Sequence, residues 1–80
     1  MIKEKIAKLA SDLFGKEITE SYIGNRSKFI RGQGRIFEAY IVNDNYDDLI
    51  SSGEIGSYNK SYETLLRKLQ KELDNKAKQS

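Results

Sequence analysis

The two ends of this chain have the hydrophobic spacing of amphipathic α-helices, whereas the segment between them has the spacing of β-strands. In residues 2–14 apolar side chains recur three or four positions apart, which predicts a helix that stops at Gly15. Residues 62–73 repeat this pattern, and residues 35–42 form a β-branched and aromatic run typical of a strand. Because one apolar face must be covered by another, we expect both helices to pack on one sheet.

The predicted strand at residues 35–42 is the centre of that sheet. Its alternation places Phe37, Ala39 and Ile41 on one wholly apolar face, which we expect the helices to cover. The other face is mixed and open to solvent or a partner. It comprises Ile36, Glu38, Tyr40 and Val42.

The remaining strands are less sharply bounded. Residues 18–31 indicate one or two strands, which the glycines of the 32–34 loop would connect to the central strand as a hairpin, although Gly24-Asn25 is a competing turn signal. Residues 44–53 are expected to form a loop with one helical turn, and residues 54–58 a short third strand.

The predicted fold is a single α+β domain spanning residues 1–80, with the order α-β-β-β-α. Asn59 or Ser61 is expected to cap the last helix, which should fray into a basic tail from about residue 74. Eighty residues allow only one small core. The residues expected to carry its stability are Phe14, Phe37, Ile41, Leu66 and Leu69.

The composition argues against catalysis. The chain has no Cys and no His, so it lacks disulfides, thiolate metal ligands and the commonest general base. No carboxylate pair has a nearby lysine at the spacing of a metal-dependent nuclease. We therefore expect a non-enzymatic protein without cofactor or metal. With no apolar run long enough to span a bilayer, we expect it to be cytoplasmic and to have no membrane partner.

Charge is strongly segregated along the chain. Residues 21–37 carry four basic residues and no acidic one, whereas residues 38–59 carry five acidic residues and no basic one. The net charge of +2 is too small for bulk attraction to nucleic acid. The segregation instead indicates a protein that meets a charged partner at a defined surface.

The basic hairpin is the leading candidate for that surface. Arg31 and Arg35 flank the turn, and Arg26 and Lys28 should share a strand face. These cations could grip a partner's carboxylates or phosphates, and Tyr22 or Phe29 could stack on a base or pack on an apolar rim. The competing interpretation is a solvated edge strand whose charges prevent aggregation.

A second candidate is the acidic surface formed by Asp44, Asp47 and Asp48. Clustered carboxylates can hold Mg²⁺ or Ca²⁺, but the ligand spacing of a calcium-binding loop is absent. A solvated turn is the favoured interpretation. A third is that the carboxylates imitate phosphates toward a basic partner.

Two resemblances bear on function. The helix, three strands, helix order resembles the double-stranded-RNA-binding domain, and residues 53–73 are similar to the way that family enters its last helix. That family presents several lysines there, whereas this chain has only Lys60. The same segment also looks like small antitoxin-type sheet proteins. In size, composition and charge segregation the chain resembles accessory proteins of phages and mobile elements, including anti-CRISPR inhibitors, which implies binding without catalysis.

These observations lead to three expectations for function. The first is a small inhibitor or accessory protein that binds a nucleic-acid-processing, defence-nuclease-like complex of its host or a competitor. The alternative is a regulator that binds nucleic acid directly through phosphate contacts. A homodimer joined by edge strands or leucine-rich helices is the third, and the sequence leaves the choice between monomer and dimer open.

Overall fold

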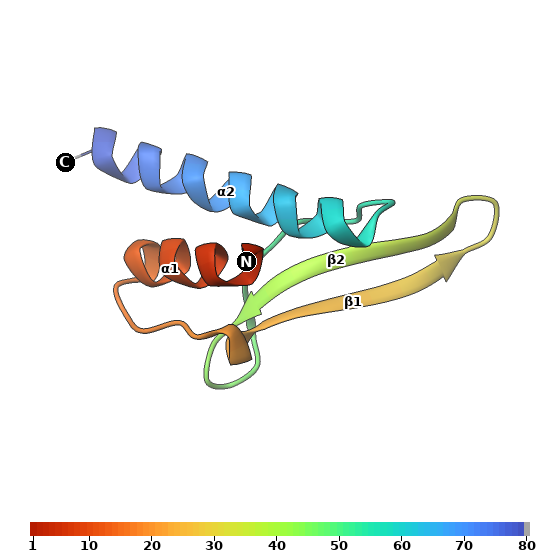
Figure 1. The fold of residues 1–80 in the computed structure, drawn as a ribbon, viewed down its shortest axis with the longest axis horizontal. Coiled ribbons are helices and arrows are strands. Elements are labelled where there is room, and N and C mark those ends of the chain that lie inside the picture. Colours follow the sequence, from red (N-terminus) through yellow and green to blue (C-terminus); the bar gives the residue numbers. More distant parts are fainter. Residues whose placement is uncertain (80) are drawn as a thin grey trace.

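The computed structural model describes residues 1–79 and confirms the α+β class. Two helices lie side by side on one face of a three-stranded antiparallel sheet and run in the same direction (Figure 1). The elements in chain order are α1 (Ile2–Phe14), the 3₁₀ turn η1 (Glu20–Tyr22), β1 (Ile23–Ile30), β2 (Gly34–Val42), β3 (Asp48–Ser51) and α2 (Tyr58–Lys78).

The first helix has the predicted bounds. Gly15 ends it in a left-handed conformation, with φ of 69°, and its N–H donates to the Ser11 carbonyl at 3.0 Å. The Ser11 hydroxyl then accepts a hydrogen bond from the Ile18 N–H at 2.8 Å. The chain is thereby turned back toward the sheet directly after α1.

The last helix is longer than predicted at both ends. Its N-cap is Ser57, whose hydroxyl accepts from the Lys60 N–H at 3.3 Å, so the prediction of Asn59 or Ser61 is wrong. Ser57 is the last extended residue, and Ser61 is buried inside the helix. The helix also continues past residue 74 to Lys78, because no Gly or Pro interrupts it there.

A contact with α1 holds this final part of α2 in place. The Lys76 ammonium donates to the Leu13 carbonyl at 3.1 Å. Leu13 lies in the last turn of α1, where carbonyl groups lack helical partners and where the helix dipole favours a cation. The prediction of a frayed tail is therefore wrong for residues 74–78, which form the last turns of the helix, while residue 80 lies outside the described residues.

The sheet order is β1-β2-β3. β1 and β2 pair without interruption from Ile23↔Ile41 to Ile30↔Gly34. The predicted hairpin loop is thus correct, and it is closed by the Gln33 N–H donating to the Ile30 carbonyl at 2.9 Å. Gly24 and Asn25 lie within β1 and form no turn.

The third strand lies earlier than predicted. β3 occupies Asp48–Ser51, whereas residues 54–58 contribute only the isolated pairing of Ile55 with Phe37. The buried Ser52 lies between these two pairings. Its N–H donates to the Ala39 carbonyl, and its hydroxyl accepts from the Ala39 N–H in place of a backbone carbonyl. From the sequence, residues 44–53 are expected to form a loop with one helical turn. Residues 48–51 of this segment instead form the extended strand β3.

The core lies between the two helices and one face of the sheet. Ala39 and Ile41 of β2 are fully buried there, as predicted, while Phe37 is only partly buried. Of the other residues expected to carry stability, Leu69 is fully buried, and Phe14 and Leu66 are partly buried. Ile6 and Leu65, which belong to the apolar stripes of the two predicted helices but are not among the residues expected to carry stability, are also fully buried.

Candidate functional site

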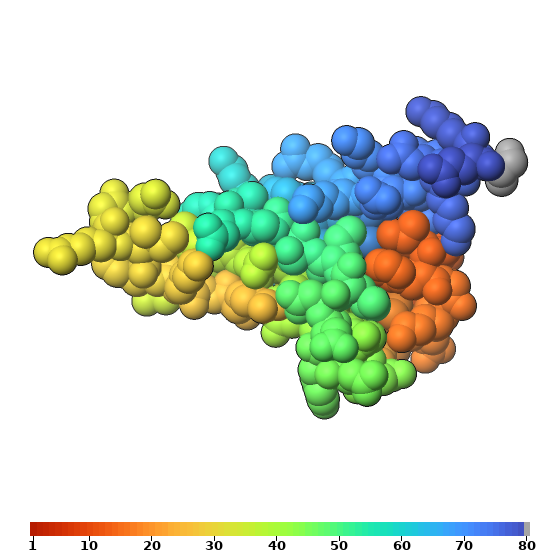
Figure 2. All heavy atoms as spheres, turned by 180° about the vertical axis from the view of Figure 1, so that it is seen from behind, coloured from red at the N-terminus to blue at the C-terminus, as the bar shows by residue number. Residues whose placement is uncertain are grey.

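The β1–β2 hairpin extends beyond the helices and forms an arm at one end of the molecule (Figures 1 and 2). We call residues 27–35 the hairpin arm. Its most unusual residue is Phe29, whose side chain is 69% exposed although it lies in a regular strand. Since the helices do not reach this end of the sheet, no core residue covers the ring. An exposed phenylalanine of this kind is a candidate contact for another molecule.

Arg26 is located on the sheet face that no helix covers, and its charge is neutralised within the chain. Its guanidinium donates to both carboxylate oxygens of Asp48, at 2.7 and 2.9 Å, and lies 3.3 Å from Glu38. The hydrogen bond to Asp48 raises the pKa of Arg26. The guanidinium also stacks 4.1 Å from the centre of the Tyr40 ring. Arg26 therefore joins all three strands.

Lys28 shares this open face, as predicted, and is likewise paired. Its ammonium lies 2.8 Å from a carboxylate oxygen of Glu54, and that hydrogen bond raises the pKa of Lys28. Arg26 and Lys28 together therefore contact three carboxylates of the acidic segment. The charge segregation seen along the sequence is largely compensated within the folded sheet. These ion pairs depend on which residues lie opposite each other on neighbouring strands, so they could not be predicted without the strand register.

The other two cations of the hairpin remain available. Arg31 lies in the exposed turn, and Arg35 pairs with Phe29 across the two strands. Arg35 donates to the Ser27 hydroxyl at 3.2 Å. Within residues 1–79 neither arginine forms an ion pair. Of the predicted site, Phe29, Arg31 and Arg35 therefore lie together on the arm, and the charges of the two arginines are not neutralised by carboxylates of the chain.

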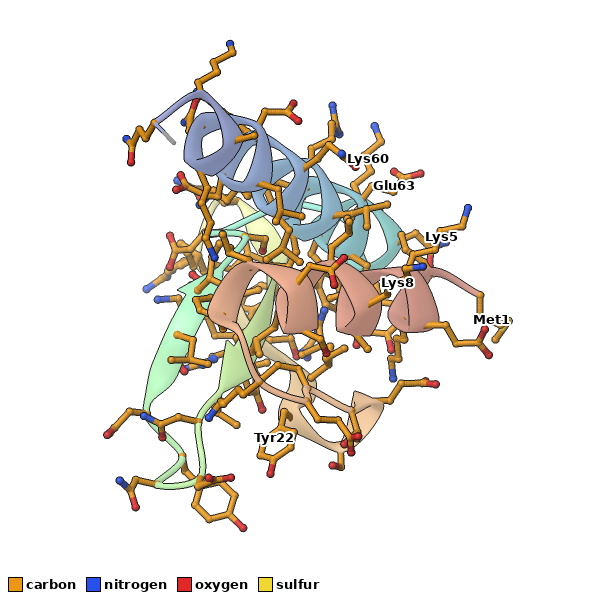
Figure 3. All side chains as sticks on the ribbon, turned by 90° about the vertical axis from the view of Figure 1, so that its left-hand side faces the viewer. Met1, Lys5, Lys8, Tyr22, Lys60 and Glu63 are labelled. Carbon is orange, nitrogen blue, oxygen red and sulfur yellow. The ribbon has the colours of Figure 1, made fainter. Side chains whose placement is uncertain are left out.

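Tyr22 lies at the opposite end of β1 from Phe29 and is not part of the hairpin arm. Its hydroxyl donates to a carboxylate oxygen of Asp44 at 2.7 Å, and this bond raises the pKa of the tyrosine. Figure 3 shows Tyr22 extending from η1 toward the loop after β2. Tyr22 therefore belongs with the acidic loop.

The three predicted acidic residues have different surroundings. Asp48 pairs with Arg26 and Asp44 with Tyr22, whereas Asp47 forms no ion pair within residues 1–79. The Asn43 side chain closes the loop by accepting from the N–H groups of Asn45 and Asp47. The part of the chain that the structure describes contains no group of three or more potential ligand side chains suited to a metal ion.

The outer surface of the helices carries further cations. Lys5 and Lys8 of α1 and Lys60 of α2 point away from the sheet, with Glu63 close to Lys60 (Figure 3). Lys60 is the one residue that the start of the last helix shares with the lysine-rich pattern of double-stranded-RNA-binding domains. No helix among residues 1–79 is long and apolar enough to cross a membrane.

Comparison with protein-family models, curated proteins and solved structures finds no match to this chain. The resemblances to double-stranded-RNA-binding domains, antitoxin-type proteins and phage accessory proteins therefore remain expectations.

The packing of Tyr40 on Gly24 leads to a prediction about the open face. A Cβ atom at Gly24 would overlap the Tyr40 ring. We expect Gly24→Ala to displace this ring from its contact with Arg26 and to cost about 0.5–1 kcal/mol of unfolding free energy, the scale of an exposed cation–π contact, because the far end of the ring can move toward solvent. In a Tyr40→Ala background the same change should cost nothing, because alanine suits a strand better than glycine. Urea unfolding of the proteins with and without Gly24→Ala, in the wild-type and the Tyr40→Ala backgrounds, measures the two differences in unfolding free energy. An equal loss in the two backgrounds would show that Tyr40 is not the obstacle.

Proposed function

We propose that this chain is a small, non-enzymatic inhibitor or accessory protein that binds a nucleic-acid-processing protein complex through its hairpin arm. The observation that carries the proposal is the exposed Phe29 on the hairpin arm. Arg31 and Arg35 lie on the same arm, and neither arginine forms an ion pair within residues 1–79. The class of partner rests on the resemblance to phage accessory proteins.

The chemistry of the arm defines the partner surface that would suit it. Aromatic and arginine side chains are the commonest dominant contacts of protein interfaces, since they combine large apolar area with directed hydrogen bonding. Phe29 would enter an apolar pocket, and the guanidinium groups of Arg31 and Arg35 would meet carboxylates at its rim. Figure 2 shows the arm, in yellow, extending beyond the helices, so the helices would not obstruct such a contact.

Direct binding to nucleic acid is less well supported by this geometry. Arg26 and Lys28 would have to leave Asp48, Glu38 and Glu54 before they could contact phosphates. Only Arg31 and Arg35 are then available on the hairpin. Two phosphate contacts on duplex DNA would give a salt dependence of roughly 1.8 log units of affinity per log unit of salt. A steeper slope would require a larger basic surface than the arm provides.

Affinity capture from cells that naturally contain this protein tests the proposal. The tagged chain should retain a protein partner after nuclease treatment, and Phe29→Ala or Arg31→Glu should reduce the retained amount at least tenfold, in line with dominant interface residues. Arg67→Glu is the matched control, because Arg67 is an exposed arginine on α2 and the charge change is identical. Capture that survives both Phe29→Ala and Arg31→Glu, or that Arg67→Glu reduces to the same extent, would contradict the proposal.

Loss of binding must be separated from loss of folding. Since the Phe29 ring is largely exposed, we expect Phe29→Ala to change the unfolding free energy by no more than about 0.5 kcal/mol. Urea unfolding followed by circular dichroism measures this difference. If all capture depends on nucleic acid, the direct nucleic-acid regulator takes the place of the protein-binding proposal.

A further inference from the structure

A second surface lies at the other end of the sheet. A recess of about 430 Å³ opens there on the face that no helix covers. Three tyrosines line it, one each from η1, β2 and the loop between β2 and β3: Tyr22, Tyr40 and Tyr46. Val42 and Gly24 contribute to the same lining. Phe29 of the arm is seven residues along the chain from Tyr22 and does not line this recess, so the two aromatic surfaces are separate.

The walls of the recess are fixed by contacts within the chain. The hydrogen bond from Tyr22 to Asp44 ties η1 to the loop after β2. Two backbone hydrogen bonds close that loop. The Asn43 N–H donates to the Asp47 carbonyl, and the Tyr46 N–H donates to the Asn43 carbonyl. Figure 2 shows this segment, in green, as a projection from the body. Tyr46 is held there with its side chain 85% exposed.

The charge around the tyrosines is negative. Asp48 lines the recess, Asp44 accepts the hydrogen bond from the Tyr22 hydroxyl, and Asp47 belongs to the same loop as Asp44. Glu17 contributes to the raised pKa of Tyr22. The one cation in the lining is Arg26, whose charge is already opposed by the carboxylates of Asp48 and Glu38. A positively charged group between Tyr22 and Tyr46 would therefore meet aromatic rings and the carboxylate of Asp44, which forms no ion pair within residues 1–79.

We propose that this recess binds an arginine or lysine side chain of an extended segment of a protein partner. The aromatic faces attract a cation through their quadrupoles, and this attraction is stronger where water is partly excluded. The chain already displays this chemistry once, since Arg26 stacks 4.1 Å from the Tyr40 ring while two carboxylates hold it. A second guanidinium between Tyr22 and Tyr46, with Asp44 beside it, would repeat that arrangement.

A peptide titration monitored by NMR tests the proposal. The probe is acetyl-Gly-Arg-Gly-amide, and the control is the same peptide with citrulline, which keeps the shape of arginine and removes its charge. We expect saturable shifts of the amide signals of Tyr22, Gly24, Tyr40 and Tyr46. The citrulline peptide should bind at least roughly tenfold more weakly, which is the scale of a partly desolvated cation–π contact. Equal affinity for the two peptides, or no saturable shift, would overturn the proposal.

Two variants separate this surface from the hairpin arm. Tyr46→Ala should weaken binding of the arginine peptide roughly tenfold and leave the folded spectrum otherwise intact, since the side chain is almost fully exposed. Phe29→Ala also removes an exposed aromatic residue and should leave peptide binding unchanged. The opposite pattern, with loss at Phe29 and none at Tyr46, would contradict the assignment of the recess. Failure of the arm as a partner-binding surface would leave this titration unaffected.

Discussion

Replacing Leu65 with alanine is expected to lower the unfolding free energy by about 2–5 kcal/mol, which is a large part of the total stability of so small a domain. Leu65 is fully buried and belongs to the core cluster between α2, α1 and the sheet. The loss has two sources, the transfer of the removed atoms and the cavity that they leave. Urea unfolding measured by circular dichroism should show an earlier midpoint with little change in slope.

The neighbouring Leu66 provides the matched control. It has the same side chain on the same helix but is only partly buried. Leu66→Ala should therefore cost clearly less than Leu65→Ala, although the sequence pattern places both leucines on the apolar face and only Leu66 is among the residues expected to carry stability. If Leu66→Ala proved the more destabilising of the two, the orientation of α2 on the sheet would be wrong.

The stability of the fold is expected to fall at alkaline pH through Tyr62. Burial, followed by the nearby Tyr58 hydroxyl at 3.5 Å, raises the pKa of Tyr62 to about 12 from the ordinary value near 10. Between these two values the unfolded chain releases the phenol proton while the folded chain keeps it, so unfolding is favoured as pH rises. The contribution is fully present below pH 10 and is lost toward pH 12. Its size is about 2–3 kcal/mol.

Tyr62→Phe isolates this contribution from the titration of lysines in the same range. The variant lacks the phenol but keeps the ring, which packs edge-on against Tyr58 with 5.2 Å between ring centres. The difference in unfolding free energy between the two proteins should shift in favour of the variant as pH rises from about 9 to 11.5. A difference that stays constant over that interval would show that the Tyr62 pKa is not raised by folding.

The helices and the central strand could be predicted because their signals are local. In α1, and at Ala39 and Ile41 of β2, the spacing of apolar residues agrees with the buried face that the structure shows. On the opposite face of β2 the expectation of an open surface is wrong for Ile36 and Val42, which are also buried. β3 could not be predicted in the same way. Asp48–Ser51 is only four residues long, and its pairing depends on β2 and on the buried Ser52, neither of which is a local property of the segment.

The location of the hairpin could be predicted from the sequence, but which of its side chains remain unpaired and exposed could not. Glycines at the turn and basic residues on both sides of it indicated the hairpin correctly. Which cations stay free depends on register, since Arg26 lies opposite Glu38 and reaches Asp48 on the third strand. The exposure of Phe29 depends on where the helices end relative to the sheet. Both are tertiary properties, so the sequence alone treated four cations and two aromatics as one group.

The most direct test of the proposed function is photo-crosslinking from the end of the hairpin arm. Phe29 would be replaced by p-benzoylphenylalanine, which preserves the aromatic ring, and the matched control would carry the same group at Gln70, an exposed position on α2. Irradiation in cells that naturally contain the protein should give a discrete protein adduct from position 29 that resists nuclease, with none from position 70. Equal adducts from both positions, or an adduct with nucleic acid alone, would contradict binding of a protein complex through the arm.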